Sequence, residues 1–234
     1  MVSMTLKEIE NIQSSIETKR EKSRKEIMAA SLELFYEKGY QKTTTRDIIK
    51  KAGILNGSLY NRFKSKEEII LSIVIESLKR TLEECEKILE NEKNPLIAAV
   101  LPGALEVAIS SQDRKSADLI YEVHRIWGAV EEYTKMNIEW FSKYMEKYGI
   151  SFADTADAEL KMYTFLGAIG NICGYYANGG TESCDKIFTY MIMYMGSLLG
   201  MPVLDIDRTV SRLKEIVMDN GMAILSGKSD CSKE

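Results

Sequence analysis

Segment 43–68 of the chain contains side chains suited to nucleic-acid recognition. Its sequence is TTTRDIIKKAGILNGSLYNRFKSKEE. Asparagine can pair with adenine and arginine with guanine in the major groove, while hydroxyl and ammonium groups can hold phosphates. The base-facing candidates, together with two small residues that let a backbone approach, are Asn56, Gly57, Ser58, Asn61 and Arg62. The phosphate-holding candidates are Thr44, Tyr60 and Lys66.

Two short helices must position these side chains. Thr44 can cap a helix over residues 45–52, because Asp47 stands three residues on, in the place of a capping-box acid. Gly53 permits the positive φ of a tight turn, and a second helix is predicted over residues 57–63. A helix, a short turn and a second helix form the helix-turn-helix arrangement, which places its second helix in the major groove of DNA.

Flanking helices support this pair. An apolar stripe and a following glycine predict a helix over residues 23–38, and Ser65 with Glu68 forms a capping box that opens a longer helix to about residue 90. The residues expected to face inward, with Phe63 as core rather than contact, are Ile48, Ala52, Ile54, Leu59 and Phe63.

The charge of the chain is divided unevenly. Residues 18–66 contain thirteen Lys or Arg and five Asp or Glu, a net charge of +8, whereas the whole chain carries −4, so the remainder carries −12. This division indicates a basic module that touches an anion and an acidic remainder that does not. A solvated helix face is the alternative explanation of the lysines.

The same segment resembles the N-terminal signature of the TetR family of transcriptional repressors. The resemblance runs from about residue 24 to residue 71, and the segment AASLELFYEKGYQKTT, which starts within the predicted helix 23–38, also resembles the first helix of the family. The matching features are the threonine before the first short helix, RDI at 46–48, AG at 52–53, GSLY at 57–60, Phe63 and SKEE at 65–68. Beyond residue 71 the resemblance is one of helical architecture only.

The resemblance implies a role for each matched residue. Residues 57–63 correspond to the recognition helix. Positions that often reach bases are Arg46, Asn56, Asn61 and Arg62, and positions that often hold phosphate are Thr44, Ser58, Tyr60 and Lys66. Thr45, at the start of the first short helix, completes the set of expected DNA-binding residues.

Two positions depart from the family pattern. Ile49 stands where the family usually has alanine, which changes a tight helix–helix contact. Leu55 stands where the family usually has a serine-like cap, so Asn56 becomes the natural substitute cap. Asn56 would then cap the helix instead of reading a base, and the sequence leaves both roles open.

The fold class is all-α, with an N-terminal three-helix helix-turn-helix domain and a C-terminal helical domain for ligand binding and dimerisation. The expected divisions are an arm or extra helix (1–17), the DNA-binding domain (18–66), the effector and dimer domain (67–225) and a polar tail (226–234). Helices are expected for about fifteen residues from Pro95 and over 117–148, 155–177, 181–199 and 207–225.

Aromatic residues in the C-terminal part could line a cavity for a small apolar or aromatic ligand. They are Tyr121, His124, Trp127, Tyr163, Tyr175 and Tyr176. Plain core packing is the alternative for each of them. Closely spaced glycines at 167, 170 and 174 suit a two-fold helix contact, and by the family resemblance a homodimer is expected through about residues 155–199.

Other functional classes find little support in the sequence. The chain has one histidine and no C-x-x-C pair, so we expect no metal site and no cofactor. Enzyme motifs such as G-x-S-x-G and G-x-G-x-x-G are missing, so we expect no catalytic residues. The N-terminus carries charges where a signal peptide would be apolar, and the apolar stretches 96–109 and 191–204 are short, so we expect a cytoplasmic protein away from membranes.

The predicted function is a homodimeric repressor that binds palindromic operator DNA and is released by a small molecule. Release requires that the ligand prefer the form whose recognition helices are wrongly spaced for DNA, and the long helix from Ser65 is the expected moving element. An activator role stays open. The alternative is a helical protein that binds a small molecule or a protein and carries a vestigial DNA module.

Overall fold

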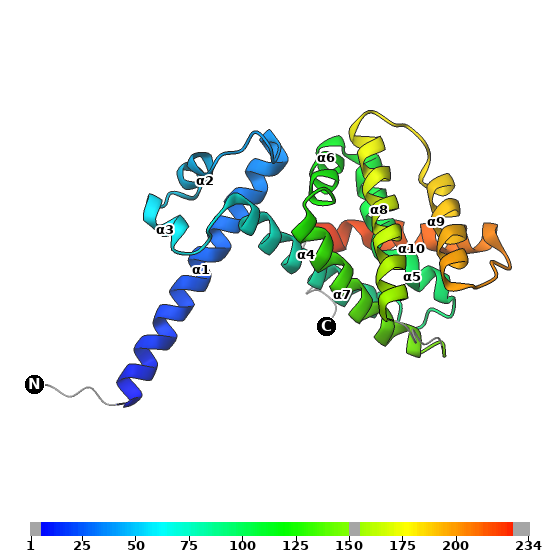
Figure 1. Ribbon diagram of the computed structural model, residues 1–234, viewed down its shortest axis with the longest axis horizontal. Coiled ribbons are helices and arrows are strands. Elements are labelled where there is room, and N and C mark those ends of the chain that lie inside the picture. Colours follow the sequence, from blue (N-terminus) through cyan, green and yellow to red (C-terminus); the bar gives the residue numbers. More distant parts are fainter. Residues whose placement is uncertain (1–5, 150–154, 227–234) are drawn as a thin grey trace, which may run out of the picture. The chain divides into compact units, whose positions relative to one another are not determined.

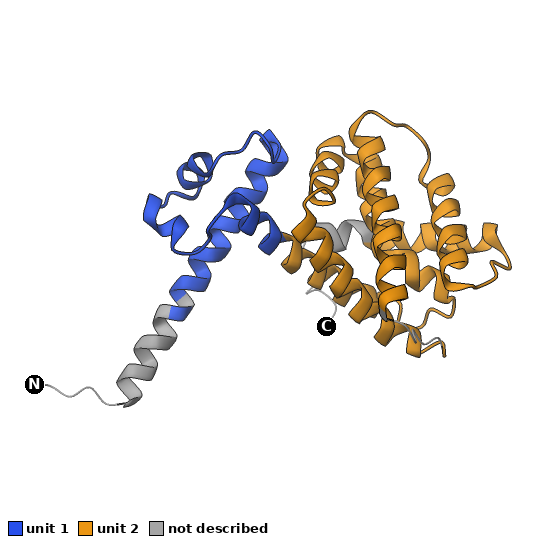
Figure 2. Ribbon diagram, in the orientation of Figure 1, with its two compact units in different colours: residues 1–73 blue, residues 74–234 orange. Residues whose placement is uncertain are grey.

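The computed structural model describes residues 6–149 and 155–226, and the regular elements among them are α-helices (Figure 1). The predicted all-α fold class is confirmed. The chain divides into two compact units, Met1–Ile73 and Val74–Glu234 (Figure 2). Helix α4 (Lys66–Ile88) begins in the first unit and ends in the second, whereas the expected domain boundary, after residue 66, lay at the start of this helix.

Unit 1 contains α1 (Leu6–Lys38), α2 (Thr45–Ala52), α3 (Asn56–Tyr60) and the first turns of α4. Its fully buried side chains come from all four helices and from the turn after α3, so that each short helix is held by its neighbours. The largest of them are Ile27, Phe35, Ile48, Leu59, Phe63, Ile69 and Ile70. The prediction that Phe63 belongs to the core is confirmed.

Some predicted helix bounds in unit 1 differ from the structure. Helix α2 has the predicted bounds, but α3 covers Asn56–Tyr60 rather than 57–63, because the backbone turns at its C-cap, Asn61. We expected an arm or an extra helix over residues 1–17. In the structure, residues 6–17 form the first part of α1. Residues 1–5 lie outside the described part of the chain, as do residues 227–234 of the expected tail.

Unit 2 is built around a central helix, α5 (Pro95–Gln112), which packs against α6 (Arg114–Val123), α8 (Thr155–Ala177), α9 (Cys184–Leu199) and α10 (Ile206–Ser226). Helix α7 (Trp127–Glu146) packs mainly against α8. Figure 1 shows α5 behind α8 and α9. The length and composition of α5 would allow it to cross a membrane, but 67% of it is buried inside unit 2, as expected of a core helix.

The predicted helix over residues 117–148 is two helices, and that prediction was wrong. Helix α6 ends at Val123 and α7 begins at Trp127, with an extended backbone at Ile126. The break itself, residues 124–126, contains no proline or glycine, although Gly128 follows in the first turn of α7. The physical reason is tertiary, since His124, at the end of α6, is held by Glu106 of α5 at 2.8 Å.

Candidate nucleic-acid interface

The first short helix begins at the cap that the sequence predicts. The Thr44 hydroxyl accepts a hydrogen bond from the Asp47 amide (3.2 Å), and the Asp47 carboxylate accepts one from the Thr44 amide (2.8 Å). The Lys38 ammonium donates to the same carboxylate (2.7 Å) and, with the two bonds from Thr44, lowers the pKa of Asp47 well below its ordinary value. The Thr44 hydroxyl also donates to the Asp47 carboxylate. Thr44 therefore fixes the N-terminus of α2 while its side chain remains exposed.

The turn between α2 and α3 leaves the second helix without a side-chain cap. Gly53 ends α2 in the left-handed conformation (φ 65°), as predicted. Leu55 is the N-cap of α3, has no side-chain capping bond and is 80% exposed. Asn56 is the first residue of the helix, so the alternative in which Asn56 acts as the cap is wrong. Its amide is exposed and is therefore available to a partner.

The outer face of α3 is polar and open. Asn56, Gly57 and Asn61 are exposed, and a Cβ atom placed on Gly57 would meet no atom within 4 Å. Tyr60 is 51% exposed and its hydroxyl lies 3.4 Å from that of Thr45 in α2. This exposure argues against core packing of Tyr60, and it places two hydroxyls together at the edge of the face.

The two arginines expected to reach bases differ in their surroundings. The Arg62 guanidinium turns back onto α3 and donates to the Ser58 carbonyl at 3.0 Å, while its Nε is buried without a described partner. Arg46 is exposed on α2 and forms no ion pair among the described residues. Arg46 is therefore open to a partner at the surface, whereas part of the Arg62 guanidinium is already hydrogen-bonded to the backbone of α3.

Lys66 has an internal role that the sequence did not indicate. Its ammonium donates to the Tyr40 carbonyl (2.8 Å) and the Thr43 carbonyl (3.0 Å), and it lies 4.2 Å from the centre of the Tyr40 ring. These contacts join the start of α4 to the loop before α2. The contacts of Lys66 show that its ammonium holds the loop before α2 in place. Phosphate binding by Lys66 stays a prediction.

A second internal cation was also missed. Arg24 of α1 donates to the Ser72 hydroxyl of α4 at 2.7 Å and lies 4.5 Å from the centre of the Phe63 ring. The residues are 48 positions apart, so no local pattern could reveal the contact. Part of the local +8 charge is thus structural, while Arg46, Lys50 and Lys64 stay exposed without a described ion pair.

The six aromatic candidates of unit 2 do not line one cavity. Trp127 is 64% exposed and stacks on Tyr163, with ring centres 5.6 Å apart. Tyr176 is buried and its hydroxyl donates to the Glu182 carbonyl at 2.8 Å. Tyr121 and Tyr175 border a separate open hollow of about 490 Å³.

His124 belongs to a buried polar cluster in unit 2. Its Nε2 lies 2.8 Å from a carboxylate oxygen of Glu106, and its ring meets that of Tyr133 edge-on at 5.5 Å. Burial, followed by the charge of Glu106, raises the pKa of Tyr133 well above its ordinary value, and the same two causes raise the pKa of Cys173 to about 12. Glu106 and Tyr133 were not predicted, although a lone carboxylate in an apolar helix was the available signal.

Metal ligands do not gather in the part of the chain that the structure describes. Over residues 6–149 and 155–226, no three His, Cys, Asp or Glu side chains come together as a group able to hold a metal ion.

Part of unit 1 is similar to known proteins. The sequence model described as "Bacterial regulatory proteins, tetR family" matches residues 27–73. Residues 27–73 are therefore similar to the N-terminal domain of this family. A stretch of 73 residues is 37% identical to the HTH-type transcriptional repressor KstR2 of Mycolicibacterium smegmatis. This stretch covers 31% of this chain and 36% of that protein.

A second relative also matches about a quarter of the chain. The fatty acid metabolism regulator protein of Bacillus subtilis is 34% identical over 62 residues, which is 26% of this chain and 32% of that protein. The chain thus spans about a third of the length of the curated relatives it matches.

Solved structures extend the likeness to the fold of most of the chain. A protein described as a TetR-family transcriptional regulator from Syntrophomonas wolfei has a TM-score of 0.58 at 19% identity, covering 79% of this chain and 99% of that one. RolR, solved with resorcinol, has a TM-score of 0.59 at 15% identity, covering 84% and 96%. At these identities the likeness concerns the fold alone.

The position of Lys66 predicts that Lys66→Met loosens the loop before α2. Two carbonyls lose a charged donor, which costs about 1–3 kcal/mol. The measurement is denaturant unfolding together with amide exchange over residues 40–45. Lys64→Met, at an exposed neighbouring lysine, is the matched control and should leave both unchanged. Equal stability of the two variants would contradict the positioning role.

Proposed function

We propose that this protein is a transcriptional regulator, a repressor that binds palindromic operator DNA as a homodimer and is released by a small molecule. The observation that carries the proposal is the exposed polar face of α3, a helix that is fixed from behind by Leu59 and Phe63. The repressor names of the relatives matched by unit 1 support it. A regulator of chromosomal genes works in the cytoplasm and needs no catalytic residues.

The division of labour on DNA follows from exposure. Asn61 and Arg46 are the residues we assign to base edges, because both are exposed and their side chains have no described partner. Tyr60 and Thr45 present adjacent hydroxyls suited to a phosphate. Asn56, which does not cap α3, is a further candidate for base contact.

The DNA-binding proposal predicts selection of a palindrome from a pool of random duplexes. Asn61→Ala should then relax the base preference at one position of each half-site and cost about 1–3 kcal/mol, the worth of a bidentate base contact. The measurement is fluorescence anisotropy over a series of salt concentrations. Asn91→Ala, at an exposed asparagine outside unit 1, is the control. If no sequence is enriched over random DNA, the protein is not an operator-binding regulator.

An uncovered stripe on α8 and α9 supports dimerisation through this part of the chain. From residue 160 to the end of α8, the exposed positions recur every three or four residues, so they lie on one face of the helix. They are Leu160, Thr164, Gly167, Asn171 and Tyr175. Helix α9, which packs against α8, exposes Tyr190, Met193 and Tyr194. Large apolar side chains in such a row are typical of a surface covered by a second copy.

The dimer proposal predicts that Met193→Glu produces monomers. The new charge would be buried without a partner, which costs about 3 kcal/mol or more and raises the dimer dissociation constant at least about a hundredfold. Sedimentation velocity measures the change. Met218→Glu is the matched control, because Met218 is as exposed but lies on α10. A dimer of unchanged strength in Met193→Glu would remove this face as the interface.

The buried polar cluster around Glu106 and His124 supports an effector site within unit 2. Near it, the buried hydroxyl of Ser110 interacts with the Cys173 thiol and that of Thr134 with the Tyr163 hydroxyl, but neither contact has the geometry of a well-formed hydrogen bond. Buried polar groups normally have partners, and a water or a ligand supplies the missing ones. We assign the cluster to a small molecule with hydrogen-bonding groups, such as a hydroxylated aromatic compound.

The state of these hydroxyls can be tested without knowing the effector. If Thr134 has no well-formed hydrogen bond, Thr134→Val should leave the free energy of unfolding unchanged or raise it by up to about 1 kcal/mol. Thr209→Val is the control, since that buried hydroxyl donates to the Asp205 carbonyl at 2.7 Å and accepts from the Asn94 side-chain amide at 3.3 Å, so its loss should cost at least about 1 kcal/mol. Chemical denaturation measures both. A loss in Thr134→Val equal to that of the control would contradict a hydroxyl without a well-formed hydrogen bond.

A helical protein with a vestigial DNA module is the alternative function. The open face of α3 and the exposed Arg46 leave the residues that an active module needs accessible to DNA. The selection experiment above separates the two functions directly.

A further inference from the structure

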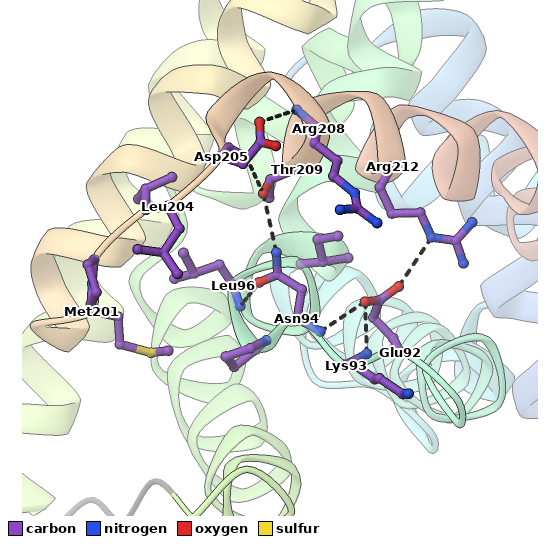
Figure 3. A pocket seen from close by; sticks show the side chains of 14 residues that line it. Glu92, Lys93, Asn94, Leu96, Met201, Leu204, Asp205, Arg208, Thr209 and Arg212 are labelled. Atoms are coloured by element: carbon purple, nitrogen blue, oxygen red, sulfur yellow. Dashed lines mark hydrogen bonds and ion pairs between the residues drawn. The ribbon is translucent and has the colours of Figure 1, made fainter.

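A large hollow lies at one end of unit 2, away from the polar cluster. Its volume is about 620 Å³, and it lies between the start of α5, the connection from α9 to α10 and the first turns of α10 (Figure 3). Leu96 lines it, and Glu106 follows ten residues later on the same helix, which is about 15 Å away along the helix axis. The hollow is therefore separate from the site proposed for the effector.

The hollow has an apolar wall. Leu96 and Ile97 are buried side chains at its base, and Leu204 beside them is 92% exposed. Covering the exposed surface of Leu204 with a hydrocarbon would remove apolar surface from water, which is favourable. The size and the apolar lining suit a small molecule, since binding pockets are of this order of volume.

Most charges around the hollow are already engaged. Glu92, whose side chain is only 10% exposed, forms an ion pair with Arg212 at 3.2 Å. Its carboxylate also accepts hydrogen bonds from the backbone amides of Lys93 and Asn94. Asp205 accepts the backbone amide of Arg208 at 3.1 Å. The two carboxylates on the rim therefore have donors from within the protein.

Arg208 is different. Figure 3 shows its side chain extending from α10 beside that of Arg212, and its guanidinium has no ion pair among the described residues. Helices α5 and α10 both begin at this hollow, so the positive ends of two helix dipoles add to the charge of the guanidinium. An unpaired guanidinium, two helix starts and an apolar wall meet in one place.

We propose that this hollow binds an amphipathic carboxylate, a molecule with one anionic head and a hydrocarbon or aromatic body. The head lies on the Arg208 guanidinium, which can bind a carboxylate through two parallel hydrogen bonds. The body lies against Leu96 and covers Leu204. Neither part alone suffices, because the guanidinium is exposed to water and the apolar wall offers no hydrogen bond.

The test uses the full chain and three probes in isothermal titration calorimetry. Octanoate carries head and body, octan-1-ol carries the body without the charge, and acetate carries the charge without the body. Octanoate should bind at least about tenfold more tightly than either of the others, since it alone makes both contacts. Binding of octanoate no tighter than of acetate or octan-1-ol would overturn the proposal.

Variants then locate the binding. Arg208→Gln should weaken octanoate binding at least about tenfold and leave octan-1-ol unchanged, and Leu204→Ser should weaken both. Both residues are exposed, so the variants should fold, which circular dichroism checks. Arg80→Gln, at an exposed arginine of α4, is the matched control and should bind octanoate as the wild type does. Equal octanoate affinity in Arg208→Gln and the wild type would place the ligand elsewhere and overturn the assignment.

Discussion

A helix of five residues cannot hold itself together in water, and this constraint governs unit 1. Helix nucleation fixes several residues for each hydrogen bond gained, so isolated short helices are unstable. Helix α3 exists because Leu59, within it, and Phe63, just after it, are fully buried against the other helices. The side chains on its outer face therefore do not have to pack against the rest of unit 1. The residues that could read bases are exposed because the residues that fold the helix all lie on the other side.

The same constraint explains why some cations of unit 1 lie inside it. A core made of short helices has polar loop ends close to its surface, and these ends need donors. Lys66 supplies one for two loop carbonyls, and Arg24 joins α1 to α4 across the Phe63 ring. Basic charge in this segment thus serves both the fold and the exposed face, so a count of lysines and arginines overstates the charge offered to an anion.

The features that the sequence predicts well are local. The cap at Thr44, the glycine turn at Gly53 and the serine bond at the start of α4 each depend on residues within four positions. The features that escaped prediction depend on distant partners. The break after α6 follows from the pairing of His124 with Glu106, 18 positions earlier, and the role of Lys66 follows from carbonyls 23 and 26 positions away. Leu55 at the start of α3 shows the reverse case, where packing holds a helix whose local cap is missing.

In unit 2 the dominant constraint is the burial of α5. Four helices pack around it, so a shift of α5 would disturb close contacts on every side, and protein interiors tolerate such shifts poorly. Its only carboxylate, Glu106, must be paired, which fixes His124 and with it the end of α6. The start of the same helix forms the wall of the hollow near Arg208. A ligand at either place would contact a helix that is mostly buried. Any coupling between the two places would therefore pass through the packing of α5, because it is the one helix that contributes to both.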